Sequence, residues 1–174
     1  MQVHVRWCVS MQTVLSGVVA AAVLVLAQPV QAQTDIAWRH AAGGSVPRGA
    51  MVAGAESNGA ALYVCVAAYA GGYHPGKVRP GFNGCNIGYG GREIAVAEYD
   101  VAMGQANWVR ARGGMVPVNA LSAAAEASGE ALYFCRAWYA GGTHPGKVRP
   151  GFRGCNIGYG GNEVTVNEYE VMVW

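Results

Sequence analysis

The chain has few charged residues and almost no lysine. Charged residues make up 13% of its 174 residues, and lysine occurs only as Lys77 and Lys147. Beyond residue 32, 11 Lys and Arg residues stand against 10 Asp and Glu residues, and both signs are scattered along the sequence. Nucleic-acid-binding proteins present a basic patch or stripe. We therefore expect no nucleic-acid partner.

Long apolar runs are absent after residue 32, so we expect no membrane span in that part of the chain. Before it, Arg6 precedes an apolar stretch at residues 14–27, and Val30 and Ala32 supply small residues after that stretch. This order is typical of a secretory signal peptide. We expect residues 1–32 to be a cleaved signal peptide that carries Cys8 away, and the product to be secreted or periplasmic. A buried N-terminal helix is the alternative.

An internal duplication dominates the rest of the sequence. Residues 38–104 recur at 108–174 with a constant offset and no gap, and segments 74–91 and 144–161 differ only at Asn83 and Arg153. Two long copies do not form a solenoid, whose repeats are about 20–50 residues long and more numerous. The duplication predicts one domain over residues 33–174, with pseudo-twofold symmetry, in which any site occurs twice.

The pattern inside each copy favours short strands. Leu-Tyr-Val-Cys within residues 61–69 and Leu-Tyr-Phe-Cys within 131–139 suit a half-buried pleated surface, and Ala-Gly-Gly and His-Pro-Gly turns are expected to follow. A change of alternation near Glu98 predicts a bulge. Ala-rich residues 120–127 favour a helix locally, but the equivalent residues 50–57 contain Gly54, so we expect none. The fold class predicted is all-β, with antiparallel sheets. Further strands are expected at residues 50–54, 76–79, 85–89 and 93–101 and at the same offset in the second copy.

The cysteines after residue 32 form two pairs, each twenty residues apart: Cys65 with Cys85, and Cys135 with Cys155. An even number in an exported chain predicts disulfides. Repeat symmetry allows these two pairs or a fully crossed arrangement, and we favour the pairing within each repeat. A zinc site that adds the two histidines of the His-Pro-Gly motifs is disfavoured, because short C-x-x-C ligand pairs are lacking. We expect neither a metal nor another cofactor.

Several short motifs occur in the same order in both copies. They are W-x-x-x-x-G-G-x-V-P, L-Y-[VF]-C, H-P-G-K, Y-G-G-x-E and E-Y-[DE]-V. In these motifs the sequence resembles the DM9 repeat, with copies at residues 38–103 and 108–174. The resemblance implies an all-β, pseudo-twofold domain of two tandem repeats. A characterised member of this family is a mannose-binding lectin.

The resemblance also implies a sugar site. In the family, the lysine of the Pro-Gly-Lys motif and an acidic residue about twenty positions earlier hold the sugar, which here are Lys77 with Glu56 and Lys147 with Glu126. Carboxylates accept hydrogen bonds from sugar hydroxyls, and ammonium groups donate to hydroxyl oxygens. This chain has Glu where the family has Asp. The extra methylene puts sugar selectivity in doubt.

Other residues are secondary candidates. Each lysine could instead form a structural ion pair with Glu93 or Glu163 that fastens the Tyr-Gly-Gly-x-Glu turn. His74 and His144 either contact the ligand or complete a turn before Pro-Gly.

The function we expect is carbohydrate binding at two equivalent sites, with glycans or glycoconjugates of the mannose type as partners. Trp138, which stands where the first copy has Ala68, predicts that the surroundings of the two sites differ. No nucleophile with a histidine and an orienting acid is evident, so we expect no enzyme. The alternative is a non-catalytic envelope or extracellular module that binds protein. A homodimer would increase the avidity of weak sites.

Overall fold

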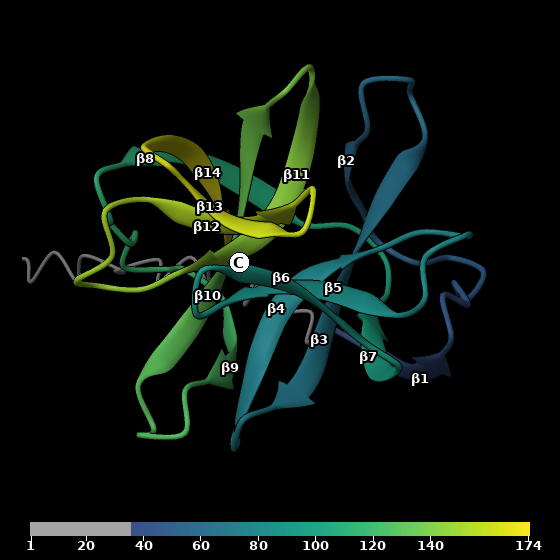
Figure 1. Cartoon of the computed structure of the whole chain (residues 1–174). Helices are drawn as coiled ribbons and strands as arrows, with labels where there is room; N and C mark the ends of the chain where they lie inside the picture. Colours follow the sequence, from purple (N-terminus) through teal and green to yellow (C-terminus); the bar gives the residue numbers. More distant parts are fainter. Residues whose placement is uncertain (1–35) are drawn as a thin grey trace, which may run out of the picture. The chain divides into compact units, whose positions relative to one another are not determined.

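Turns connect fourteen strands, with no helix, in the part of the chain that the structure describes, residues 36–174 of a computed structural model (Figure 1). The expected signal peptide lies outside these residues. The first repeat contributes β1 (Trp38–Ala42), β2 (Val52–Ala55), β3 (Ala61–Tyr69), β4 (Gly72–Val78), β5 (Cys85–Tyr89), β6 (Arg92–Val96) and β7 (Glu98–Ala102). The second contributes β8 (Asn107–Arg112), β9 (Ser122–Ala125), β10 (Ala131–Tyr139), β11 (Gly142–Val148), β12 (Cys155–Tyr159), β13 (Asn162–Val166) and β14 (Glu168–Val173).

Each repeat has antiparallel strands that pair in the same order. In the first, the strand order is β1-β7-β3-β4-β5-β6, with β2 also paired to β3. The second repeats this order as β8-β14-β10-β11-β12-β13, with β9 paired to β10. The repeats join where β2 pairs with β11, β9 with β4, and β6 with β13. These reciprocal pairings confirm the predicted all-β, pseudo-twofold fold.

The buried side chains follow the same symmetry. Each repeat has its own apolar cluster, which contains a cysteine pair, and a third cluster is shared between the repeats. Residues of both copies meet in the shared cluster, including Met51, Val64, Leu121, Phe134 and Met172. Burial of these side chains therefore contributes to holding the two repeats together.

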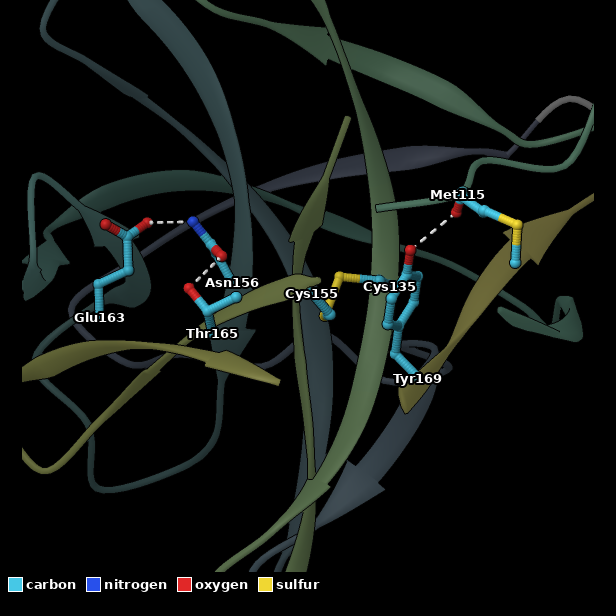
Figure 2. The surroundings of a disulfide bond; sticks show 7 residues. All are labelled: Met115, Cys135, Cys155, Asn156, Glu163, Thr165 and Tyr169. Atoms are coloured by element: carbon cyan, nitrogen blue, oxygen red, sulfur yellow. Dashed lines mark hydrogen bonds between the residues drawn. A yellow bond between two sulfur atoms is a disulfide. The ribbon is translucent and has the colours of Figure 1, made fainter. Parts of the chain in front are cut away.

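Two disulfides confirm the pairing within each repeat. Cys65 is bonded to Cys85, and Cys135 to Cys155, so the crossed arrangement and the zinc site are both wrong. Figure 2 shows the second bond, which links β10 to β12 beside Tyr169. All four cysteines are fully buried. Each disulfide therefore ties the longest strand of its repeat to the strand beyond its hairpin partner.

The expected strands at 61–69, 131–139 and 85–89 are confirmed, while other expectations need correction. The strand expected at 93–101 is two strands, β6 and β7, that break at Ala97. The strand expected at 76–79 begins earlier, so His-Pro-Gly is not a turn but part of β4. The turn is made upstream at Ala70 and Gly71, whose φ values of 49° and 83° reverse the chain before the histidine.

Two strands escaped prediction, β1 and β8, and both are edge strands. Their sequences, WRHAA and NWVRAR, lack the apolar alternation that marks a buried strand, and most of their residues are exposed. Charged side chains are common on edge strands, where they discourage pairing with other chains. The Ala-rich segment that favours a helix locally instead contains β9, as the repeat comparison predicts.

Candidate functional site

Each candidate site is built from both repeats. We call the residues around Lys77 the first site and those around Lys147 the second site. In the first site, Lys77 lies on β4 directly opposite Asn86 on β5, and Glu93 extends from the next strand, β6. Glu56 follows β2. The second repeat adds His144, so the expected pair of acid and lysine is part of a larger cluster.

The two lysines are almost fully buried, with 2% exposure each. The Nζ atom of Lys77 lies 3.2 Å from Nδ1 of His144 and 3.8 Å from Oε1 of Glu93. It is also 5.4 Å from the ring centre of Tyr159. The cation is thus held between a carboxylate and groups of the other repeat. In the second site, Lys147 Nζ lies 3.2 Å from His74 Nδ1 and 5.2 Å from the Tyr89 ring centre, but the carboxylate paired with it is that of Glu126, at 3.7 Å.

The histidines orient these lysines. Nε2 of His144 lies 3.1 Å from the carbonyl oxygen of Tyr139, which can only accept, so Nε2 carries the proton. Burial lowers the pKa of His144, and the charge of Lys77 lowers it further, so the ring is neutral and Nδ1 accepts from the lysine. His74 has the same arrangement with Tyr69 and Lys147. Both rings have 0% exposure, so they reach a ligand only through the lysine.

Glu93 and Glu163 hold the turns of the opposite repeat. Oε1 of Glu93 accepts from Nδ2 of Asn86 at 3.1 Å, and Oε2 accepts from the backbone N–H of Gly161 at 3.0 Å. Glu163 does the same with Asn156 and Gly91. A Cβ on Gly158 would lie 2.8 Å from Cγ of Glu93, so the close approach requires glycine there. The ion pair expected for Lys77 with Glu93 is present, whereas Lys147 pairs with Glu126. The turns that Glu93 and Glu163 fasten belong to the other repeat.

Burial and charge act in opposite directions on the lysines. Burial lowers the pKa of Lys77 from its usual 10.5, and the carboxylates of Glu93 and Glu56 counteract part of that effect. The pKa of Lys147 is lowered in the same way, with Glu126 and Glu163 opposing it. A buried ammonium group next to carboxylates is a strong hydrogen-bond donor.

A cavity of about 370 Å³ opens at the first site. Its walls include four charged side chains, an amide and two aromatic rings: Glu56, Lys77, Arg79, Glu93, Asn86, Phe82 and Tyr159. Such a set can bind a neutral, hydroxyl-rich ligand, because it combines acceptors and donors with apolar ring faces. Sequence reasoning missed Phe82 and Asn86, although both lie within the segment that is nearly identical in the two copies.

The described residues show neither a metal centre nor a membrane helix. No group of three or more His, Cys, Asp or Glu side chains in residues 36–174 is arranged to hold a metal ion. No helix in this part of the chain has the length and apolar character to cross a bilayer.

Comparison with solved structures gives one informative match. A crystal structure of the nematode sperm cell motility protein MFP2B superposes with a TM-score of 0.58 at 15% sequence identity. The match covers 84% of this chain and 48% of that chain, so this protein spans about half the length of its neighbour. At this identity the likeness shows a common fold. Among proteins with curated descriptions, none matches the sequence.

The family comparison agrees with the duplicated architecture. The DM9 repeat model matches twice in tandem, at residues 19–96 and 84–166. Both matches begin and end upstream of the internal repeats at 38–104 and 108–174, yet each contains one copy of the Pro-Gly-Lys motif. Together with the pseudo-twofold fold and the repeated site, these matches show that the chain belongs to the DM9 repeat family.

Proposed function

We propose that this protein is a lectin-like module that binds glycans, with mannose-type sugars as the ligand class, and does not transform them. The observation that carries the proposal is the buried ammonium of Lys77 at a cavity that also exposes the carboxylate of Glu56. Its counterpart at Lys147 gives a second position for binding. Two sites in one chain suit a weak binder, because avidity rises when both engage one glycoconjugate.

The groups around the cavity match the parts of a sugar. A carboxylate such as Glu56 accepts from two neighbouring hydroxyls, and Lys77 donates to their oxygens. The rings of Phe82 and Tyr159 line the same cavity and can cover the C–H face of a pyranose. A glycan would thus find partners for both its polar edge and its apolar face.

The same contacts argue against catalysis at this site. Glycoside hydrolysis needs two carboxylates about 5–9.5 Å apart that act on one bond. Glu93 is the second carboxylate of the first site, and both of its oxygens accept hydrogen bonds from Asn86 and Gly161. The four cysteines of residues 36–174 are oxidised and cannot act as nucleophiles. We therefore propose binding without turnover.

We further propose that the protein acts in the periplasm or outside the cell. Two buried disulfides fit an oxidising compartment. A homodimer would place four sites on one particle and increase avidity further. The motility role printed for the MFP2B structure is not carried over, because 15% identity supports the fold alone.

A non-sugar interaction module is the second candidate. The near-complete burial of Lys77 and Lys147 favours it, because both lysines also serve the contact between the repeats. In that case the repeated His-Pro-Gly-Lys motif would serve the packing of the two repeats, and a protein partner would bind elsewhere on the surface.

A glycan array separates these candidates. The wild type is compared with the double variant Glu56→Ala, Glu126→Ala, which removes the site carboxylates and keeps both buried lysines. Its matched control is Glu98→Ala, Glu168→Ala, which removes two carboxylates at equivalent positions outside the cavity. We expect mannose-terminated glycans to bind the wild type and the control but not the site variant. Absence of glycan binding by a folded wild type would leave the interaction module as the better reading.

A further inference from the structure

We propose that the two sites are unequal, and that the first site is the principal ligand site. The difference is set by two pairs of equivalent residues, Ala95 against Thr165 and Ala60 against Glu130. This inference rests on the proposed function and specifies which of its two sites is occupied first.

The first difference concerns the amide oxygen of the site asparagine. In both sites the asparagine Nδ2 donates to a glutamate, at 3.1 Å for Asn86 and 3.2 Å for Asn156. In the second site, Oδ1 of Asn156 also accepts from Oγ1 of Thr165 at 2.9 Å, as Figure 2 shows. In the first site the facing residue is Ala95, which has no hydroxyl, and the buried Oδ1 of Asn86 has no partner.

An unpartnered buried acceptor is costly, and native proteins rarely keep one without a reason. Asn86 lines the cavity of the first site. A ligand hydroxyl that donates to Oδ1 would take the place that Thr165 holds in the second site. The first site thus has an acceptor without a partner, Oδ1 of Asn86. The equivalent acceptor of the second site, Oδ1 of Asn156, is already bonded to Thr165.

The second difference concerns the arginine next to each lysine motif. In the second repeat, Nη1 of Arg149 donates to Oε1 of Glu130 at 3.1 Å. Position 60 of the first repeat is alanine, and there Nε of Arg79 lies 3.5 Å from Oε1 of Glu56. In the second site, Arg149 therefore pairs with Glu130, which lies outside the pair of Glu126 and Lys147.

This change alters how the site acid and lysine are paired. In the second site, Oε1 of Glu126 lies 3.7 Å from Nζ of Lys147, so the two groups neutralise each other. Among residues 36–174, no ion pair within 4 Å joins Glu56 to Lys77. Instead, Glu56 pairs with Arg79, and Lys77 pairs with Glu93. The acid and the ammonium of the first site are thus not paired with each other, and each can bind a different hydroxyl of one ligand.

The ligand that fits is a neutral vicinal diol. One hydroxyl would donate to Glu56, its neighbour would donate to Oδ1 of Asn86, and Lys77 would donate to their oxygens. A pyranose carries such pairs of hydroxyls. A charged ligand is less suited, because the carboxylates of Glu56 and Glu93 balance Lys77 and Arg79 at this site.

The test exchanges the two residue pairs between the copies. The forward variant, Ala95→Thr with Ala60→Glu, gives the first site the residues of the second, and the reverse variant, Thr165→Ala with Glu130→Ala, does the opposite. Titration calorimetry with methyl α-mannopyranoside measures affinity and stoichiometry. NMR signals of the Asn86 and Asn156 side-chain amides identify which site responds. Each of the four substitutions introduces the residue found at the equivalent position of the other copy.

We expect the wild type to bind one mannoside more tightly than a second and to shift the Asn86 signals first. The forward variant should bind about five- to tenfold more weakly, which is the effect of one lost hydrogen bond to a buried acceptor. The reverse variant should gain a second site of similar affinity. Equal affinity of both wild-type sites, or unchanged binding by the forward variant, would overturn this inference alone. A folded wild type that binds neither the mannoside nor any array glycan would overturn the proposed function with it.

Discussion

Replacing Glu93 with alanine should destabilise the protein through the contact between its repeats. The Glu93 carboxylate is 12% exposed and meets three groups: the ammonium of Lys77, Nδ2 of Asn86 and the backbone N–H of Gly161. Alanine leaves each of them without this partner. Because Gly161 belongs to the second repeat, the loss acts on the junction between the copies as well as on the first site.

The structure sets the size of the effect. Removing one partner of a buried ion pair costs about 3–5 kcal/mol, because the other charge stays buried and uncompensated. Here Lys77 keeps its hydrogen bond to His144, so we expect the lower end, about 3 kcal/mol. For a domain of this size, each kcal/mol lowers Tm by roughly 3–4 °C, which predicts a decrease of about 10 °C.

Thermal unfolding followed by circular dichroism, with the disulfides intact, measures this decrease. The control is Glu98→Ala, which removes an equivalent carboxylate whose side chain is 68% exposed. Its ion pair with His40 lies on the surface, where such pairs contribute about 0–1 kcal/mol. If Glu93→Ala melted within about 2 °C of the wild type, less than 1 kcal/mol would be lost, and the assignment of Glu93 to the repeat junction would be wrong.

Two other predictions concern the disulfides and the histidines. The Cys65→Ser, Cys85→Ser variant opens a loop of 20 residues and should lose about 3 kcal/mol in denaturant unfolding, and an unchanged midpoint would contradict that estimate. In an NMR titration, the pKa of buried His74 and His144 should lie below the usual 6.5, and that of exposed His40, held by Glu98 and Asp100, above it. The buried rings should therefore make the fold less stable as the pH falls below 6.5 through their folded pKa. The stabilisation from His40 has the opposite dependence: it is present below pH 6.5 and is lost as the pH rises through the raised pKa of His40. Titration of all three at 6.5 would refute this reasoning.

The strands and cysteine pairs were predictable because they depend on local pattern and on repeat symmetry. Aromatic and apolar residues at 61–69 and 131–139 mark the longest strand of each copy, and both bounds are confirmed. Repeat symmetry reduced the cysteine pairings to the one within each copy or a fully crossed arrangement, and the structure has the pairing within each copy.

A local turn signal gave a wrong prediction where neighbouring residues already make the turn. The Pro-Gly step after His74 is a common turn signal, but Ala70 and Gly71 reverse the chain first, so the step continues the strand. The edge strands β1 and β8 were missed for a different reason. Exposed strands carry polar side chains and leave little apolar pattern to detect.

By itself, the sequence determined that the protein is duplicated and rich in strands. It favoured disulfides within each copy and made Lys77 and Lys147 candidate site residues. Only the tertiary structure decided that each lysine meets the histidine of the other copy, 67 residues away for Lys77 and 73 for Lys147. The His-Pro-Gly-Lys motif is identical in both copies, so no local pattern can say which histidine contacts which lysine. That choice depends on how the two repeats pack against each other. The structure also shows what the replacement of Thr165 by Ala95 means, because Oδ1 of Asn156 is bonded to Thr165 and the buried Oδ1 of Asn86 has no partner.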